Sequence, residues 1–308
     1  MALPLRWHVI HNPNAVNFGK YYTWEAIKEI LLKNNFVFQE HLAPNQISCH
    51  EIIAGLKNEN IRHFVVIGGD GTLNEVVNAL YNNGYNTSDV VLALIPSGTG
   101  NDWARTHNIR ARNKELADMF LKGKIVQHDV GVVSVTTGTK NQQRYFVNIA
   151  GFAFDAEVIQ RINKTSKPQK GNKMLYLKNL FLSLLNNKPV QCRLRVDDYT
   201  FEKNVFSLAV GICRYNGGGM MQVPVADFRD GFFNVVLIEP LNLLEIFIQL
   251  PKLYKGTHIN YKKIHLFKGR EIEIVPQRNI PAEVEGEIVG EGVFIIKAAP
   301  AYINVLVP

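Results

Sequence analysis

The sequence lacks several features that would place it quickly in a class. Its three cysteines are scattered, which excludes a disulfide framework or a cysteine-rich zinc site and suits a reduced, cytosolic protein. No apolar run reaches the ~18 residues of a transmembrane helix, and the start of the chain lacks the charged-then-apolar layout of a signal peptide. Neither the Walker A pattern nor Gly-x-Gly-x-x-Gly occurs, which argues against an ordinary P-loop or a nicotinamide-binding Rossmann turn.

The charge balance is basic. The 308 residues include 34 Lys and Arg against 27 Asp and Glu, which gives a formal net charge of +7. Positive charge favours anionic partners, such as nucleotides, nucleic acid or an acidic membrane face, without choosing among them. The length and the 46% hydrophobic content suit one large or two medium folded domains.

Two glycine-rich loops each follow a short apolar run. The first spans Gly68–Thr72 and the second spans Pro96–Asp102. Because glycine has no Cβ, backbone N–H groups in such loops can close around a phosphate. A helix expected to begin at Thr72 adds its partially positive end. The loops therefore predict one phosphate site with the carboxylates of Asp70 and Asp102 beside it, as in nucleotide binding and phosphoryl transfer.

The first 130 residues alternate between strands and helices. We expect strands at 5–10, 36–40, 63–67 and 90–95, and helices at 22–34, 48–56, 72–81 and 114–122, with another beginning near residue 101. Ser48-x-x-Glu51 and Thr72-x-x-Glu75 both match the capping box of a helix start. This alternation predicts a doubly wound, parallel α/β sheet, whose ligands lie at the carboxyl ends of its strands.

From about Asp129 the pattern changes to short strands separated by turns. Strands are expected at 130–135, 144–149, 192–196, 206–212, 233–238, 265–267, 271–275, 294–297 and 303–307, with helices near 171–186 and 241–255. This pattern predicts a mainly antiparallel β-sandwich. We therefore expect an α/β nucleotide-binding domain over residues 1–130 and a β-sandwich substrate domain over 131–299.

The segments Gly68–Val76 and Pro96–Arg105, which contain the two loops, resemble motifs of the diacylglycerol/sphingosine lipid kinase family, and in particular of its soluble bacterial members. The resemblance runs nearly end to end. Further segments that resemble the family are Asn12-Pro13, 148–156, 216–219, 224–231 and 281–287. Within 148–156, Ala153 stands where the family usually has glycine.

The resemblance implies a fold related to NAD kinases and phosphofructokinases, with residues 300–308 completing the first domain. It implies an ATP- and magnesium-dependent kinase that acts on a lipid hydroxyl, with Asp70 and Asp102 orienting the magnesium–nucleotide. It also implies a structural magnesium ion held by Asp227, Asp230 and Phe232, although that loop alone is typical of a hairpin turn. The nucleotide-binding residues would be Asn12, Gly68, Gly69, Asp70, Gly71, Thr72, Glu75, Gly98, Thr99 and Asn101.

The late acidic segment reads Glu285-Gly286-Glu287 where the family usually has Asp-Gly-Glu. On an extended strand, Glu283, Glu285 and Glu287 would share one face. The resemblance places the general base, which removes the proton from the attacking hydroxyl, in the pair of Glu285 and Glu287. Glu287 matches the family's glutamate, and the choice between the two stays open.

Several partners and alternatives follow from these patterns. The lysine-rich stretch 164–178 fits either a helix that packs on the sandwich or a face that meets anionic headgroups. We expect a cytoplasmic protein, peripheral to the inner face of an anionic membrane, with a lipid substrate and no nucleic-acid partner; a homodimer is left open. The acceptor lipid is not identified, and a NAD kinase-like enzyme or a non-catalytic nucleotide or lipid sensor remain as alternatives.

Overall fold

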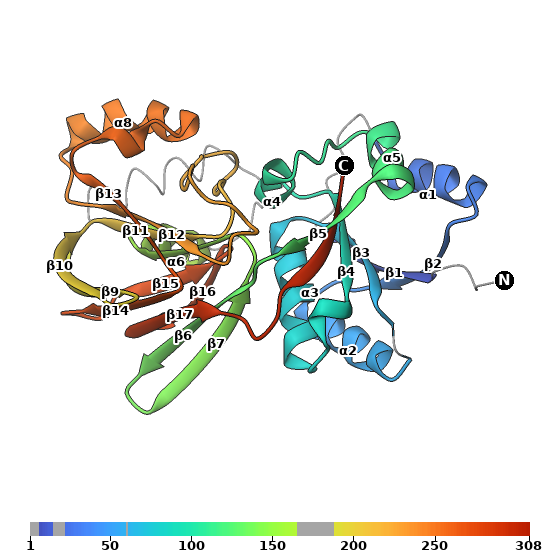
Figure 1. Ribbon diagram of the computed structural model, residues 1–308, viewed down its shortest axis with the longest axis horizontal. Helices are drawn as coiled ribbons and strands as arrows, with labels where there is room; N and C mark the ends of the chain where they lie inside the picture. Colours follow the sequence, from blue (N-terminus) through green and yellow to red (C-terminus); the bar gives the residue numbers. More distant parts are fainter. Residues whose placement is uncertain (1–5, 15–21, 60, 165–187) are drawn as a thin grey trace. The chain divides into compact units, whose positions relative to one another are not determined.

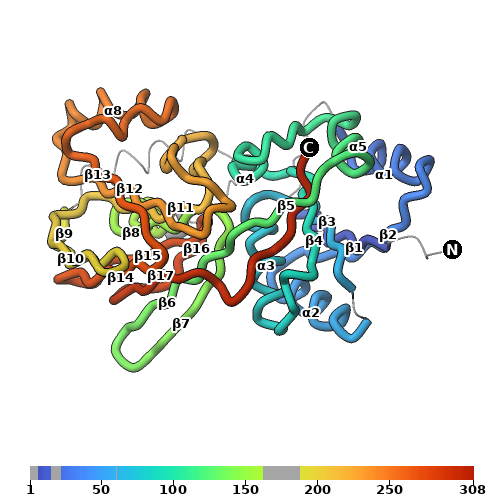
Figure 2. Tube along the Cα trace, in the orientation of Figure 1, coloured from blue at the N-terminus to red at the C-terminus, as the bar shows by residue number. Residues whose placement is uncertain are grey.

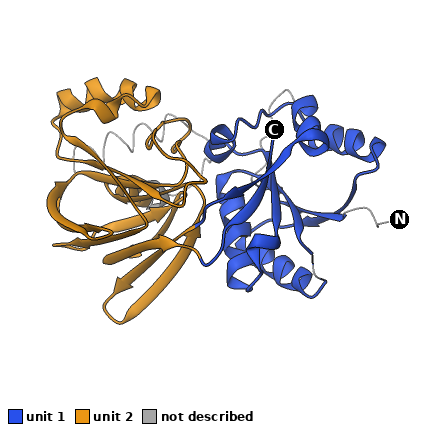
Figure 3. Cartoon of the chain, in the orientation of Figure 1, with its two compact units in different colours: residues 1–130, 300–308 blue, residues 131–299 orange. Residues whose placement is uncertain are grey.

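The computed structural model describes residues 6–14, 22–59, 61–164 and 188–308. The chain folds into two compact units (Figure 3): the first consists of Met1–Val130 with Pro300–Pro308, and the second of Gly131–Ala299. The first unit is an α/β fold and the second is a β-sandwich with antiparallel sheets (Figure 1). This confirms the fold class expected from the sequence.

The first unit is built on a mostly parallel six-stranded sheet of order β2-β1-β3-β4-β18-β5. Its strands are β1 (Arg6–His11), β2 (Val37–Leu42), β3 (His63–Gly68), β4 (Val91–Pro96), β5 (Lys124–His128) and β18 (Ile303–Val307). Only β5 runs antiparallel to its neighbour, β18. Strand β18, from the end of the chain, lies between β4 and β5 (Figure 2). β3 and β4 are buried almost throughout, as is usual for the centre of a parallel sheet.

The helices of the first unit are α1 (Trp24–Lys33), α2 (Gln46–Lys57), α3 (Asp70–Asn82), α4 (Asp102–Thr106) and α5 (Asn113–Lys122), with a short 3-10 turn, η1 (Thr87–Asp89). The expected start of α2 at Ser48 is wrong. Asn45 caps this helix, and the side chains of Asn45 and Ser48 each accept the other's backbone N–H. The expected start of α3 at Thr72 is also wrong, because the helix already begins at Asp70 and includes Thr72 in its first turn.

The second unit contains two six-stranded sheets, of order β10-β9-β14-β17-β6-β7 and β13-β12-β11-β8-β15-β16. The strands are β6 (Gly131–Thr137), β7 (Lys140–Phe146), β8 (Ile149–Ala153), β9 (Val190–Val196), β10 (Tyr199–Val205), β11 (Ser207–Gly211), β12 (Phe233–Ile238), β13 (Ile264–Gly269), β14 (Glu271–Pro276), β15 (Pro281–Val284), β16 (Glu287–Glu291) and β17 (Val293–Ala298). Phe152 from one sheet and Phe294 from the other meet edge-on, with 5.0 Å between ring centroids. The apolar core therefore lies between the sheets.

The late acidic segment is a hairpin and not one continuous strand. Glu285 and Gly286 form the turn between β15 and β16 with φ values of 52° and 90°. Two left-handed residues in succession suit a two-residue turn, because their twist matches that of the flanking strands. The expectation that Glu283, Glu285 and Glu287 share one face of an extended strand is therefore wrong.

The helices described in the second unit are α6 (Phe154–Lys164) and α8 (Leu243–Lys255), followed by the 3-10 turn η2 (His258–Asn260). α8 confirms the helix expected at 241–255, whereas α6 was not expected. The helix expected near 171–186 lies outside the described residues. Among the helices in the described part of the chain, none combines the length and the apolar character needed to cross a membrane.

Candidate active site

The two glycine-rich loops meet at the carboxyl ends of neighbouring parallel strands. β3 and β4 pair in register as far as Gly68 and Pro96, and the backbone N–H of Ser97 donates to the carbonyl oxygen of Gly68 at 2.8 Å. Asn12, directly after β1, donates its backbone N–H to the carbonyl oxygen of Ile67 at 3.1 Å. Three segments that the sequence associates with phosphate binding thus lie at one edge of the sheet, where ligands of such sheets bind.

Gly69 and Gly98 are in direct backbone contact. A Cβ on Gly98 would lie 2.5 Å from the Cα of Gly69, and a Cβ on Gly69 would lie 2.9 Å from the Cα of Gly98. Because the obstacle on each side is backbone, no rotation of a side chain relieves the clash. Around Gly71, by contrast, a Cβ would meet nothing within 4 Å. Glycine at positions 69 and 98 therefore allows the loops to close together, as a phosphate-binding cradle requires.

Asp70 joins the first loop to the helix that follows the second. Its Oδ2 accepts the backbone N–H of Asp102 and its Oδ1 accepts that of Trp103, both at 3.0 Å. The carboxylate therefore caps the N-terminus of α4, where negative charge is favoured. Burial raises the pKa of Asp70, whereas these backbone N–H bonds lower it. In this arrangement Asp70 positions the second loop.

Asn101 closes the second loop on itself. Its backbone is left-handed, with φ of 51°, a conformation in which asparagine is enriched. Its Oδ1 accepts the backbone N–H of Gly98 at 3.0 Å, and its Nδ2 donates to the carbonyl oxygen of Gly98 at 2.8 Å. The next side chain, Asp102, is buried and pairs with Arg105 at 3.5 Å. Thr99 is exposed.

Of the remaining residues predicted to bind nucleotide, Asn12 and Thr72 contact each other, whereas Glu75 contacts a different helix. The Asn12 side chain donates to Oγ1 of Thr72 at 3.3 Å, which ties the end of β1 to the first turn of α3. Glu75 instead pairs with His50 of α2 at 3.5 Å. The capping-box interpretation of Thr72 and Glu75 is wrong, because α3 begins before Thr72 and its N-cap makes no side-chain hydrogen bond.

In the acidic loop of the second unit, the carboxylates of Asp227 and Asp230 contact groups of the protein itself. Asp230 accepts the backbone N–H of Phe232 at 3.0 Å with Oδ1 and pairs with the Lys268 ammonium at 2.8 Å with Oδ2. Asp227 accepts the backbone N–H of Arg229 at 3.2 Å. Magnesium prefers a near-octahedral shell of oxygen ligands. In this arrangement the Lys268 ammonium contacts Oδ2 of Asp230, and the magnesium site stays a prediction from the resemblance.

Glu285 and Glu287 lie in different surroundings. Oε1 of Glu285 accepts the backbone N–H groups of Val147 and Asn148 at 2.7 and 2.8 Å. Glu285 therefore holds the backbone that connects β7 to β8. Glu287 is the first residue of β16 and is exposed. Of the two carboxylates, that of Glu287 is the more accessible to a substrate.

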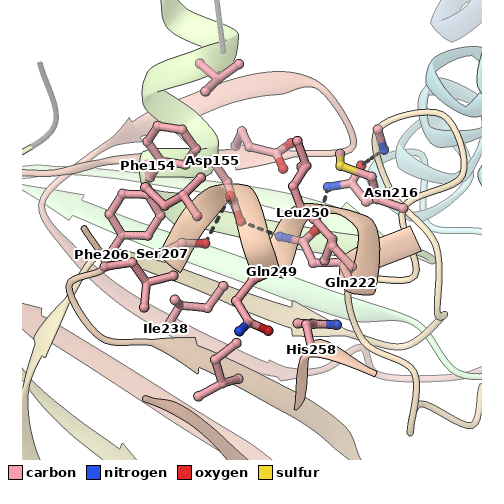
Figure 4. Close-up of a pocket in the computed structure, with 18 of the residues that line it drawn as sticks. Phe154, Asp155, Phe206, Ser207, Asn216, Gln222, Ile238, Gln249, Leu250 and His258 are labelled. Atoms are coloured by element: carbon pink, nitrogen blue, oxygen red, sulfur yellow. Dashed lines mark hydrogen bonds between the residues drawn. The ribbon is translucent and has the colours of Figure 1, made fainter. Parts of the chain in front are cut away.

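A mostly apolar pocket with a cavity volume of about 160 Å³ lies within the second unit, between α6, α8 and strands of one sheet (Figure 4). Phe154 and Phe206 stack in its wall with 4.6 Å between ring centroids. Other apolar lining residues are Val158, Ile238, Ile246, Leu250 and Leu253. The polar lining residues include Asp155, Ser207, Asn216, Gln222 and Glu283.

Two buried carboxyl groups dominate the polar part of this pocket. Asp155 accepts the Ser207 hydroxyl at 3.0 Å and the side-chain amide of Gln222 at 2.6 Å (Figure 4). Glu283 accepts the backbone N–H of Gly286 at 2.8 Å. Burial raises the pKa of Asp155 to about 6 and that of Glu283 to about 7, and the charge of Asp155 adds to the shift of Glu283. Near neutral pH such groups can either donate or accept a hydrogen bond.

The sequence did not predict that Asp155 and Glu283 lie together in a pocket. Pairing of β15 with β8 places Glu283 opposite Gly151. A Cβ on Gly151 would lie 2.6 Å from Oε1 of Glu283 and 2.9 Å from the Cβ of Asp155. A glycine within a strand signals a close approach of other atoms, so Gly151 and the nearby Asp155 offered a hint, but nothing local identified Glu283 as the partner.

The parallel sheet with its paired glycine loops and the β-sandwich define a two-unit kinase fold of the kind found in NAD kinases. Two family descriptions match: "Diacylglycerol kinase catalytic domain" over residues 6–133 and "YegS C-terminal NAD kinase beta sandwich-like domain" over residues 148–307. The chain therefore belongs to the bacterial lipid kinase family that combines these two domains.

Individual relatives agree with this membership. A diacylglycerol kinase of Staphylococcus carnosus is 27% identical over 290 residues, which cover 93% of this chain and 90% of that protein. The crystal structure of a diacylglycerol kinase from Bacillus anthracis has a TM-score of 0.71 at 17% identity and covers 99% of this chain and 97% of that one. Yeast NADH kinase has a TM-score of 0.55 at 13% identity, with 100% of this chain and 84% of that one covered. These two structural likenesses concern the fold.

Proposed function

We propose that this protein is an ATP- and magnesium-dependent kinase that transfers the γ-phosphoryl group of ATP to a lipid hydroxyl. The observation that most supports a lipid acceptor is the apolar pocket of the second unit, with polar groups clustered around Asp155 and Glu283. A diacylglycerol-like lipid, or another lipid alcohol, combines a hydrocarbon chain with a hydroxyl group and matches this division. A dinucleotide is polar along most of its length and would leave the apolar walls without a partner.

In this proposal the ATP phosphates bind at the loops that follow β3 and β4. The backbone contact between Gly69 and Gly98 supports this, because a Cβ at either position would clash with the backbone of the other loop and push the two loops apart. Backbone N–H groups and the N-terminus of α3 supply positive potential for an anion. The magnesium ion that accompanies ATP neutralises charge on the phosphates when bound. Asp70 holds α4 and the second loop in place for this binding.

The acceptor hydroxyl must lose its proton as its oxygen bonds to phosphorus and the bond to ADP breaks. We assign the proton acceptor to Glu287, because it matches the family's glutamate and its side chain is exposed. Glu285 serves instead as a backbone anchor, since two N–H groups already occupy its Oε1. Glu287→Gln should therefore lower turnover by about 10²-fold or more and leave the affinity for ATP unchanged, whereas Glu285→Gln, which keeps an oxygen acceptor, should have a small effect.

The pocket offers an independent test of the acceptor. Leu250→Trp adds bulk to a wall residue of the cavity and should raise KM for a long-chain lipid, while KM for ATP stays unchanged. The assay measures ADP release and transfer of labelled phosphate to diacylglycerol, phosphatidylglycerol, a polyprenol, a sphingoid base and ceramide in mixed micelles. Phosphorylation of NAD in place of any lipid would favour the NAD kinase-like alternative. Binding of nucleotide or lipid with no transfer to any acceptor would favour a sensor.

A further inference from the structure

Helix α8 has apolar residues on two faces. Ile246, Leu250 and Leu253 recur at helical spacing and line the pocket. On the outward side, Leu244, Phe247 and Ile248 also recur at helical spacing and are 69%, 59% and 51% exposed. A surface helix of a globular protein normally carries polar residues on its outward side. Among the residues that the structure describes, none therefore covers the outward face of α8 as its apolar composition would require.

This exposure is a contiguous feature and not one scattered side chain. Leu243 and Tyr254, at the two ends of the same helix, are 45% and 49% exposed. Figure 1 shows α8 at the edge of the second unit. Contiguous apolar patches on a protein surface mark a site of contact with a partner or a membrane, whereas single exposed apolar residues are ordinary.

The charges around α8 indicate which partner it is. Between Pro240 and Arg270 the sequence has five lysines and one arginine but a single acidic residue, Glu245. That carboxylate accepts hydrogen bonds from Tyr261 and Lys263 at 2.7 and 2.9 Å and also caps the start of the helix. The acidic group is thus neutralised locally, and exposed lysines remain at positions 252, 255 and 262. An apolar stripe flanked by lysines is complementary to an anionic lipid surface.

The apolar outward face continues into the pocket. A second hollow at the N-terminal end of α8 is lined by Leu243 and Leu244 from the exposed patch. It is also lined by Phe206, Leu241 and Ile246, all of which line the pocket as well. A hydrocarbon chain leaving a bilayer at α8 would therefore meet apolar side chains along its way to the cavity.

We propose that α8 docks on the bilayer, with Leu244, Phe247 and Ile248 inserted at the level of the headgroups and Lys252 and Lys255 against anionic lipid. The docking proposal extends the proposed function. It rests on that function only in taking the lipid that reaches the pocket to be the phosphate acceptor. The docking itself requires no catalysis. The helix would then serve both as the contact with the membrane and as a wall of the acceptor pocket.

The test measures binding of the full-length protein to vesicles by sedimentation. Vesicles contain phosphatidylcholine either alone or mixed with phosphatidylglycerol. The double variant Leu244→Gln/Phe247→Gln should weaken binding to the mixed vesicles by about tenfold or more. The variant loses the favourable transfer of two large apolar side chains from water into the bilayer. Ile47→Gln is the matched control, since Ile47 lies on α2 and is 71% exposed, and it should bind as the wild type does. Unchanged melting temperatures show that both variants are folded.

A second variant separates charge from apolar contact. Lys252→Gln/Lys255→Gln should lose about tenfold or more of the binding to mixed vesicles and change little on phosphatidylcholine alone. Equal binding by wild type and the Leu244→Gln/Phe247→Gln variant would overturn the proposal. A dimer in light scattering that this variant converts to a monomer, with vesicle binding unchanged, would also overturn it in favour of a second copy of the chain.

An assay with a short-chain, water-soluble lipid acceptor distinguishes failure of the docking proposal from failure of the proposed kinase function. The α8 variants should phosphorylate such an acceptor at the wild-type rate while losing turnover on vesicles. If no form of the protein phosphorylates any lipid and the vesicle binding still follows α8, the proposed function fails and the docking surface stands. If turnover on vesicles is unaffected by the α8 variants, the docking surface is wrong and the kinase assignment stands.

Discussion

Gly69 and Gly98 hold two loops from neighbouring strands in backbone contact, since a Cβ on Gly98 would lie 2.5 Å from the Cα of Gly69. The contact is tertiary, because Gly69 follows β3 and Gly98 lies in the loop after β4. It explains why both loops need glycine at these positions, whereas Gly71 has open space around it. The requirement for glycine is therefore specific to the place where the loops meet.

Gly98→Ala should separate the loops and reduce turnover by about 10²-fold or more, since small displacements of positioning groups have effects of this size. The affinity for ATP, measured by isothermal titration, should fall as well. Gly55→Ala is the matched control and should retain nearly full activity, because Gly55 is an exposed residue of α2, a Cβ there meets nothing within 4 Å and alanine favours the helix. Equal losses in the two variants would show that loop contact is not the cause.

Asp70→Asn should reduce both turnover and stability. The substitution replaces one of the two oxygens that accept the N–H groups of Asp102 and Trp103 with an amide that cannot accept them. We expect the unfolding free energy to fall by about 1–3 kcal/mol, and turnover to fall by about 10²-fold. Denaturant unfolding and steady-state kinetics measure the two effects. Asp118→Asn, at an exposed ion pair with Lys122, should change neither; full activity in Asp70→Asn would remove this residue from the site.

Stability should depend on pH through Glu283. Its pKa is raised from 4.5 to about 7 in the folded protein, so between these values the native state keeps a proton that the unfolded chain has released. The unfolding free energy should therefore decrease as the pH rises from 4.5 to about 7. Glu283→Gln removes this ionisation, so it should make the decline shallower and raise stability at alkaline pH, while the raised pKa of Asp155, about 6, keeps a smaller decline below that pH. Glu51→Gln, at an exposed position on α2, should leave the slope as in the wild type; a slope unchanged by Glu283→Gln would contradict the assignment.

Ala153→Gly should stabilise the protein slightly. Ala153 has φ of 61° at the junction of β8 and α6, a left-handed conformation that costs a residue with a Cβ about 1–2 kcal/mol. Loss of its buried methyl group offsets about 0.8 kcal/mol of the relief, which leaves a gain of up to about 1 kcal/mol. Chemical denaturation measures the change. Ala156→Gly, buried within α6, should have the opposite sign because glycine weakens helices, and a clear loss of stability in Ala153→Gly would show that the backbone there is unstrained.

The strands and the glycine loops of the first unit could be predicted because their signals are local. Continuous apolar runs mark β3 and β4, and glycines directly after them mark the loops. The start of α3 could not be placed, because Thr72-x-x-Glu75 offers a capping box that the structure does not use. The hydrogen bonds that Asp70 accepts from the backbone N–H groups of Asp102 and Trp103 depend on how two strands pair, which no local pattern shows.

The late acidic segment and the pocket show the same limit. Alternating glutamates at 283, 285 and 287 suggest one strand, and Glu-Gly is not among the usual signals for a hairpin. Glu285 adopts the left-handed turn because its carboxylate bonds to Val147 and Asn148, far away in sequence. Likewise, Asp155 and Glu283 form a pair only through the alignment of β15 with β8. Neither contact could be predicted from one sequence, because each joins residues that are far apart along the chain.

The most direct test of the account is acceptor-dependent ADP release, with the phosphorylated product extracted and identified. Wild-type protein with ATP and magnesium should release ADP at a rate that depends on an added lipid alcohol, and labelled phosphate should appear in that lipid. Glu287→Gln should bind ATP with unchanged affinity and produce about 10²-fold less labelled lipid. Transfer of the label to NAD, or ADP release that is the same with and without any lipid, would contradict the assignment of a lipid kinase.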